Sequence, residues 1–453
     1  MNAKHRRWLD EAFFFFAFSV LSGAYVDLPL RLTAASVSQG DSNPFNSLAM
    51  GLTLCGLVAL GGMEGRGPRF FAGWAWPVNL LLLLAALSAV WSVDPPITLR
   101  RTLTLGIAVF FGYYAVARFS MPAIIRRIAL TSLVFAVSSA ALAILLPRYG
   151  VMSEGELAGR WNGVFSHKQL LGQAIFLGIL ALSWLVARAT GWARTGLCLA
   201  ILFCMGVLLM ARSQTALLSV FAIPLLSLMT RASSLSPVAR LWAFYGMAVA
   251  AIGIAALFTL DSIDIMGVIG RDASLTGRAP LWDLLLEAAS ERLLTGYGYG
   301  AFWIVGNPVA TRVNAISGWY VPEAHNGYLD ILLQTGVPGL ALVLIAVLSA
   351  IRHAFAAAAE RTDWASFAVA FLIVAAVSNL VESMLFRSGD IQSVLVPMFH
   401  AALRARHAAP PARMGTPEMG TPETGTPGAG TPGAGTLGTA AANARSAPEK
   451  IIA

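Results

Sequence analysis

Apolar stretches of about 20 residues recur along this chain of 453 residues. A helix of that length crosses the roughly 30 Å of hydrocarbon in a bilayer. The chain is 57% hydrophobic and only 12% charged, whereas a soluble globular protein has about a quarter of its residues charged. The sequence therefore predicts an all-α polytopic membrane protein, in which helix-to-helix packing within the bilayer replaces a soluble core.

We predict twelve membrane spans, at residues 12–29, 46–63, 74–92, 102–117, 128–147, 169–187, 192–211, 213–230, 240–260, 327–351, 364–381 and 391–405. The first 23 residues place basic side chains before an apolar run, as a signal peptide does. No small-x-small cleavage site follows that run, so we interpret it as a retained first helix. The transmembrane domain so defined covers residues 1–407.

Basic residues indicate the orientation of the spans. Lys4, Arg6 and Arg7 precede the first span, and the loops after even-numbered spans are rich in arginine. These arginines are Arg66, Arg69, Arg118, Arg126, Arg127, Arg188, Arg194, Arg231, Arg240, Arg352 and Arg361, with Arg404 and Arg406 after the last span. The positive-inside rule then predicts that both termini are cytoplasmic. Because these loops explain most of the net charge of +8, no nucleic-acid partner is expected.

The cysteines and the C-terminal tail carry no predicted chemistry. Cys55, Cys198 and Cys204 all fall inside apolar stretches, so neither a disulfide framework nor a metal-ligand spacing is present. Residues 408–453 contain a five-residue repeat of Gly, Thr and Pro with nothing to bury. We interpret this tail as compositionally disordered and cytoplasmic.

Two outer loops stand apart, at residues 148–168 and 261–326. The second connects the ninth and tenth spans and is the longest connection in the chain. Within it, "APLWDLLLEAASERLL" (279–294) has helical apolar spacing and predicts an amphipathic helix against the bilayer. Long loops that are neither polar repeats nor Gly/Ser linkers are usually functional.

The sequence has no P-loop, no dinucleotide fingerprint, no His/Cys metal cluster and no Asp-x-Asp, so a metal-held nucleotide sugar is not expected. The outer face instead carries basic residues, namely Arg160, His167, Lys168, Arg212, Arg278 and His325. The planar fork of arginine suits diphosphates, and a histidine can take a proton from a hydroxyl.

Each of these residues also has a purely structural interpretation. An outer-loop arginine is most often a solvated charge. His325 with Asn326 fits the start of a helix, with the asparagine as its cap. The Gly-Val-Pro-Gly at 336–339 predicts a break or kink inside a span.

Four motifs, taken together, resemble the bacterial O-antigen ligase and O-antigen polymerase superfamily. They are "GRWNGVFSHKQLLGQ", "ARSQTALLSV", "TGRAPLWDLLLEAASERLLTGYGYGAFW" and "AHNGYLDILLQTGVPGL", in the order typical of the family and over roughly residues 155–345. "FSHK" and "GYGYGAFW" are most similar to the exopolysaccharide polymerase branch. The first five spans match only in being apolar.

The resemblance implies a multi-span glycosyltransferase of the C type in the bacterial inner membrane, active at the periplasmic face without cofactor or metal. Its substrates would be oligosaccharides on undecaprenyl diphosphate within the membrane lipid, delivered by a flippase. Chain-length and polysaccharide export proteins are further expected partners. The reaction would join lipid-linked repeat units into exopolysaccharide.

Carried over one residue at a time, the essential histidine of the family falls on His325, and its diphosphate-binding arginines fall on Arg160 and Arg278. The resemblance also implies substrate contacts for His167, Lys168 and Asn326. Two positions depart from the family pattern. Gln214 stands where a basic residue is common, with Arg212 two positions earlier as its substitute. Gln169 stands where asparagine often follows "HK", and it keeps an amide.

Two other functions remain open at this point. An O-antigen ligase would move a finished polymer onto lipid A core with the same donor and site, and the sequence does not name the acceptor. A secondary transporter is the alternative from another class, and it should carry ionisable residues near the membrane midplane. Here they gather at one surface, which favours an enzyme. Trp161, Trp282 and Trp303 are expected as sugar-stacking or interfacial surfaces.

Overall fold

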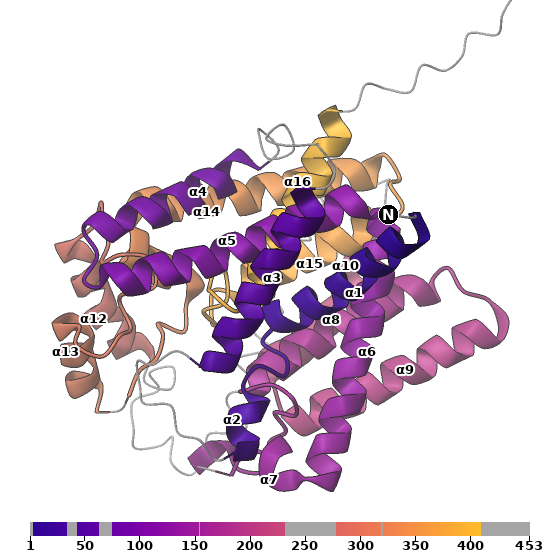
Figure 1. Cartoon of the computed structure of the whole chain (residues 1–453), viewed down its shortest axis with the longest axis horizontal. Coiled ribbons are helices and arrows are strands. Elements are labelled where there is room, and N and C mark those ends of the chain that lie inside the picture. The colour runs from indigo at the N-terminus through magenta and orange to yellow at the C-terminus, as the bar shows by residue number, and fades with distance from the viewer. Residues whose placement is uncertain are drawn as a thin grey trace, which may run out of the picture. The chain divides into compact units, whose positions relative to one another are not determined.

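The structure is a computed structural model that describes residues 3–33, 43–62, 75–153, 155–231, 278–318 and 320–408. Within these ranges the regular elements are helices, apart from one isolated bridge between Val151 and Trp161. The helices are α1 (Ala3–Leu21), α2 (Leu28–Thr33), α3 (Pro44–Gly62), α4 (Trp76–Leu87), η2 (Ser88–Val90), α5 (Pro95–Arg118), α6 (Met121–Leu145), α7 (Pro147–Gly150), η3 (Gly155–Leu157), α8 (Lys168–Val186), α9 (Gly191–Ala211), α10 (Gln214–Arg231), α12 (Arg278–Glu291), α13 (Pro308–Ser317), α14 (Gly327–Ala359), α15 (Ala365–Ser378) and α16 (Gln392–Ala408) (Figure 1).

Helices lie over eleven of the predicted spans, and the span at 240–260 lies outside the described residues. In the described part of the chain, α3, α6, α8, α9 and α14 are long and apolar enough to cross a membrane, and two shorter apolar helices are Trp76–Val90 and Ala365–Ser378. A polytopic membrane protein is therefore confirmed, while the number of twelve spans stays a prediction.

The first predicted span was wrong in its bounds. Helix α1 ends at Leu21 because the chain turns at Gly23, where φ is 77°.

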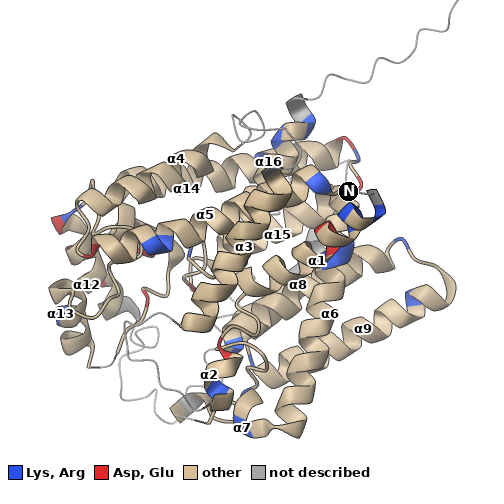
Figure 2. Cartoon of the chain, viewed as in Figure 1, with Lys and Arg blue, Asp and Glu red and all other residues tan. Residues whose placement is uncertain are grey.

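Charged residues gather mostly towards the helix ends, and long stretches of the helices carry none (Figure 2). At one end Asp10 of α1 accepts hydrogen bonds from Tyr114 and Arg118 of α5. Pairing of this kind satisfies polar groups that would otherwise be costly beside the apolar core.

Small residues bring the long helices close together. A Cβ on Gly178 of α8 would lie 2.6 Å from the Cβ of Ser132 on α6, and one on Gly112 of α5 would lie 2.8 Å from the carbonyl oxygen of Val394 on α16. Without a hydrophobic force between helices in lipid, close packing of this kind is what holds spans together.

The predicted break in the tenth span is confirmed. Helix α14 is interrupted at Gly336, where φ is 67° and ψ is −170°. Pro338 has no N–H to bond the carbonyl of Gln334, and the backbone N–H of Gly298 donates to that carbonyl instead, at 3.0 Å. The segment before α13 thus replaces the missing helical donor.

The predicted amphipathic helix is confirmed as a helix, α12. Its buried face, with Leu281, Leu285 and Ala288, belongs to a small apolar cluster with Val313 of α13 and Leu333 of α14. This face therefore packs against protein, while Leu286 on the same helix is exposed.

Several predicted outer loops meet in one place. The Nζ of Lys168, at the start of α8, donates to the carbonyl of Arg212 at the end of α9, at 3.2 Å. The backbone N–H of Gly327, at the start of α14, donates to the carbonyl of Asn379 after α15, at 2.8 Å. Residues far apart in the sequence are thus brought together beside His325.

Candidate functional site

His325 lies in a short loop just before α14, in a left-handed conformation with φ of 51°. That conformation is uncommon for a residue with a side chain and often marks a functional position. The next residue, Asn326, caps α14, because its side-chain oxygen accepts from the backbone N–H of Tyr328 at 3.0 Å and of Leu329 at 3.1 Å. The cap interpretation of Asn326 is confirmed, and the substrate contact remains a prediction.

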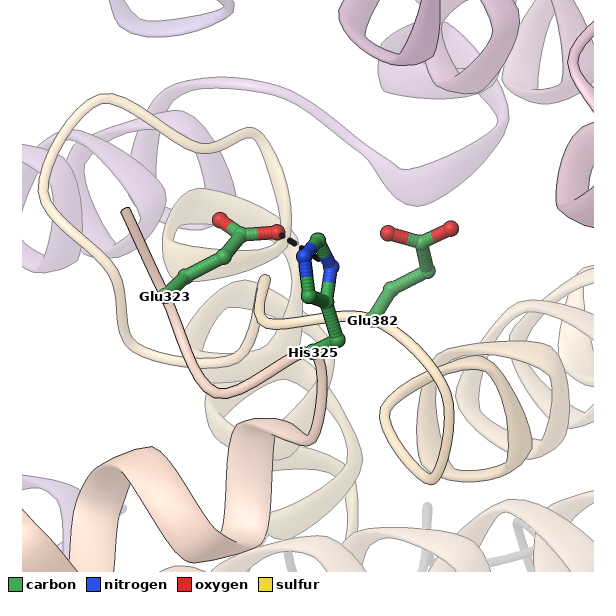
Figure 3. A group of neighbouring side chains, drawn as sticks. All are labelled: Glu323, His325 and Glu382. Carbon is green, nitrogen blue, oxygen red and sulfur yellow. Dashed lines mark ion pairs between the residues drawn. The ribbon is translucent and has the colours of Figure 1, made fainter. Parts of the chain in front are cut away.

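The imidazole of His325 lies between two carboxylates, those of Glu323 and Glu382 (Figure 3). Its Nδ1 is 3.3 Å from Oε1 of Glu323. One nitrogen or oxygen of each of the three side chains lies within 4.8 Å of those of the other two. The imidazole is about four-fifths buried, so the carboxylates act on it with little screening by water.

Glu323 is fixed by a second partner. Arg387, in the loop after α15, donates to Oε2 of Glu323, and the same Nη1 lies 3.1 Å from the carbonyl of Ser383. Burial alone raises the pKa of Glu323, but the hydrogen bond with His325 and the charge of Arg387 outweigh burial and lower the pKa to about 2. Glu323 is therefore ionised at every pH at which the protein would work.

Glu382 is fixed by donors from two other helices. The Nε2 of Gln169, on α8, lies 2.9 and 2.8 Å from the two oxygens of Glu382. The hydroxyl of Thr215, on α10, donates to Oε1 at 2.9 Å. The sugar contact of Gln169 stays a prediction, and in this structure its amide nitrogen donates to Glu382.

Glu323, His325 and Glu382 have the residue types and spacing that could hold a metal ion. Their oxygens, however, already accept hydrogen bonds, from Arg387 on one carboxylate and from Gln169 and Thr215 on the other. A cation would have to displace a guanidinium from Glu323. These donors fit a proton-transfer site better than a cation site.

The predicted basic residues of the first outer loop lie beside this cluster. Burial, followed by the charge of Lys168, lowers the pKa of His167, and Arg160 and Arg387 act in the same direction, while Glu323 opposes them. His167 also caps α8, since its Nδ1 accepts from the backbone N–H of Gln169 at 3.3 Å. The surroundings of His167 therefore favour an anion as ligand.

Two other predicted residues, Arg212 and Arg278, lie at helix ends. Arg212 ends α9 in a left-handed conformation with φ of 49°, and its side chain is exposed. Arg278 is the first residue of α12, and its side chain lies outside the described residues. Their predicted contacts with substrate stay predictions.

Trp161, Trp282 and Trp303 make structural contacts within the protein, either through the indole N–H group or by packing. Trp282 donates to the carbonyl of Ala324 at 2.9 Å, and Trp303 donates to Asp330 at 2.6 Å. Trp161 is partly buried against the main apolar core. The hydrogen bonds of Trp282 and Trp303 fix the loop that carries His325, and sugar stacking and an interfacial role stay predictions.

A further buried carboxyl lies close by, Asp390 in the loop before α16. Its Oδ1 accepts from the backbone N–H of Gln392 at 2.8 Å, and its Oδ2 lies 3.5 Å from Nε2 of Gln173. Burial raises the pKa of Asp390 to about 7, despite the opposing hydrogen bond and the charge of Arg387.

This raised pKa predicts a dependence of stability on pH. The folded protein holds the Asp390 proton more tightly than the unfolded chain, so its contribution is full below pH 4 and is lost as the pH rises towards 7. Asp390→Asn cannot ionise, and its melting temperature relative to wild type should increase from pH 5 to pH 8. Thermal unfolding in detergent at both pH values tests this. If the variant and the wild type differ in melting temperature by the same amount at both pH values, Asp390 ionises as readily in the folded protein as in the unfolded chain.

Sequence reasoning missed Glu323, Glu382 and Arg387 as members of the site. Glu323 stands two residues before His325 in a motif that was already singled out. Glu382 and Arg387 lie between the last two predicted spans. Two charged residues in such a short connection between spans could have indicated that they belong to the site.

Two comparisons with known proteins bear on this site. Residues 197–344 match the family model described as O-antigen ligase. Over 296 residues the chain is 28% identical to the exopolysaccharide production protein ExoQ of Rhizobium meliloti, a match that covers 62% of this chain and 65% of that protein. The matched region of the family includes α14 up to residue 344 and His325, and it ends before Glu382 and Arg387.

Proposed function

We propose that this chain, which is similar to the O-antigen ligase family and to an exopolysaccharide production protein, is a membrane glycosyltransferase of exopolysaccharide synthesis. It would join oligosaccharide repeat units carried on undecaprenyl diphosphate, at the periplasmic face of the bacterial inner membrane. The observation that best supports the proposal is the buried imidazole of His325 between two ionisable carboxylates, at the place where the predicted outer loops meet.

In this reaction His325 takes the proton of an acceptor hydroxyl. The hydroxyl oxygen bonds to the anomeric carbon of the donor sugar, and the bond from that carbon to the diphosphate oxygen breaks, with its electron pair leaving on the diphosphate. General-base help of this kind is worth about 10² to 10⁴-fold.

The basic residues would bind the diphosphate. We assign Arg160 and Arg278 to its oxygens, with Lys168 adding positive charge and His167 contributing a hydrogen bond beside the reacting carbon. Fixed positive charge stabilises the departing diphosphate as its charge develops. Guanidinium groups stay charged at all working pH values, so no metal is required for this step.

The family description favours one second candidate, an O-antigen ligase. It would use the same donor and the same base, and its acceptor would be lipid A core rather than another lipid-linked repeat. The exopolysaccharide relative favours the polymerase.

Arg160→Ala and Arg278→Ala should each lower polymer formation about ten- to a hundred-fold, because each removes charge-assisted hydrogen bonds worth roughly 1.5–3 kcal/mol. The test is complementation of a deletion strain at matched membrane expression, with secreted polysaccharide and lipopolysaccharide run side by side. Arg312→Gln is the control, since Arg312 is an exposed arginine of the same outer loop, paired with Glu291.

Loss of secreted polymer with accumulation of lipid-linked single repeats supports the polymerase. Loss of long chains from lipopolysaccharide, with lipid-linked polymer accumulating, establishes the ligase instead. If both variants produce polymer at the wild-type level, Arg160 and Arg278 do not bind the donor diphosphate.

A further inference from the structure

Glu323 makes a continuous chain of contacts from Arg387 to His325. One of its oxygens faces Nδ1 of His325 at 3.3 Å, and the other accepts from the guanidinium of Arg387. Glu323 itself is 9% exposed. A buried carboxylate with one basic partner on each oxygen has a single favourable orientation.

An ionised carboxylate can only accept hydrogen bonds. The 3.3 Å contact between Nδ1 of His325 and Glu323 therefore favours the tautomer with its proton on Nδ1, in which Nε2 carries the lone pair of the neutral ring. The second carboxylate, Glu382, accepts hydrogen bonds from Gln169 and Thr215, whereas Glu323 is paired with the guanidinium of Arg387. The two carboxylates beside the imidazole are thus unequal.

We propose that Glu323, held by Arg387, is a positioning residue that fixes the tautomer and orientation of His325, so that Nε2 is the atom that takes the acceptor proton. The inference rests on the proposed function, in which His325 is the base. When the acceptor O–H bond breaks, its proton moves to Nε2, and the positive charge of the resulting imidazolium is stabilised by the Glu323 carboxylate at Nδ1.

The same contacts assign Arg387 an indirect role. Glu323 would otherwise be a carboxylate buried beside a neutral ring, which is costly. Arg387 lies in the connection between α15 and α16, so the last part of the domain supports a base that lies before α14.

Glu323→Gln is the variant that tests the inference. An amide nitrogen can donate to Nδ1 and so favours the tautomer with the proton on Nε2, which cannot act as a base. The comparable substitution in a serine protease triad lowers kcat about 10⁴-fold. We expect kcat to fall about 10² to 10⁴-fold, with the KM for the lipid-linked donor within about threefold of wild type, because binding of the diphosphate does not involve Glu323.

The assay uses the full chain in lipid nanodiscs with lipid-linked repeats extracted from the deletion strain. Glu323→Asp keeps the charge and should recover at least tenfold of the activity lost in Glu323→Gln. Glu291→Gln is the matched control, because Glu291 is a carboxylate of the same outer loop in an exposed pair with Arg312. It should retain wild-type kcat.

A double-variant cycle separates positioning from a structural role. If Glu323 acts through the imidazole, Glu323→Gln should cause no further loss in a His325→Ala background. A further loss, or a melting temperature that falls in parallel with activity, would assign Glu323 to the fold and overturn the inference.

Three other outcomes would also overturn it. If Glu323→Gln is fully active while His325→Ala is inactive, His325 remains the proposed base and Glu323 has no positioning role. Loss of wild-type activity in EDTA, with recovery on adding Mg²⁺ or Mn²⁺ and no such recovery in Glu323→Gln, would make Glu323 a metal ligand instead. An active His325→Ala would show that the proposed base itself is wrong.

Discussion

Replacement of His325 by alanine should abolish polymer formation in cells and lower kcat by about 10² to 10⁴-fold in a purified assay. We assign proton transfer to the imidazole rather than to Glu323, because Glu323 is held ionised with a pKa of about 2 and its oxygens are occupied. The measurement is secreted polysaccharide from a complemented deletion strain, with extraction of lipid-linked sugars from the same cells.

Lipid-linked single repeats should accumulate in the His325→Ala strain, because donor and acceptor still reach the site. His353→Ala is a suitable control, since His353 lies on the same helix but bonds its own helix through the carbonyl of Ser349. It should support wild-type polymer levels. Wild-type polymer from His325→Ala would reduce His325 to part of a helix start.

Replacement of Gly336 by alanine should be the most damaging single change to the fold, costing about 3 kcal/mol or more. The backbone at Gly336 has φ of 67° and ψ of −170°, a region that is essentially open to glycine alone. An added Cβ would also lie 2.5 Å from the backbone carbon and oxygen of Leu294. Backbone atoms cannot move aside as a flexible side chain can, so α14 and the segment before α13 would have to separate.

The melting temperature of the purified protein in detergent measures this effect. Gly206→Ala is the matched control, because Gly206 lies within α9 and a Cβ there would meet nothing within 4 Å. Alanine favours a helix over glycine by about 1 kcal/mol, so the control should be neutral or slightly stabilising. A melting temperature of Gly336→Ala equal to that of the control would contradict the described backbone.

Local features of the chain were predictable from the sequence where a short-range rule decides them. Asn326 had to cap the helix that follows it, and the Gly-Val-Pro-Gly at 336–339 had to break that helix, because Pro338 lacks an N–H. The apolar stretches fixed the positions of most helices in the same way. The residue that donates to the freed carbonyl of Gln334 was not predictable in this way, because Gly298 lies 36 positions away in the sequence.

The candidate site was predictable only in part, because its charges meet through long-range packing. His325 was identified from its motif, but the sequence gives no distance from it to Glu382 or Arg387, which come after another complete helix. Gln169 was expected to contact sugar on the strength of its amide. In the structure that amide donates to Glu382, a partner that no spacing rule connects to residue 169.

The position of Glu382 and Arg387 between the last two helices has a consequence for the order of synthesis. A ribosome that has translated the chain as far as Ala359 has made the imidazole, both ends of α14 and every predicted diphosphate ligand. Neither Arg387, which fixes Glu323, nor Glu382 then exists. Under the proposed function, the nascent protein would therefore hold its base without support, and it would gain full activity only when α15 and the loop after it have been inserted.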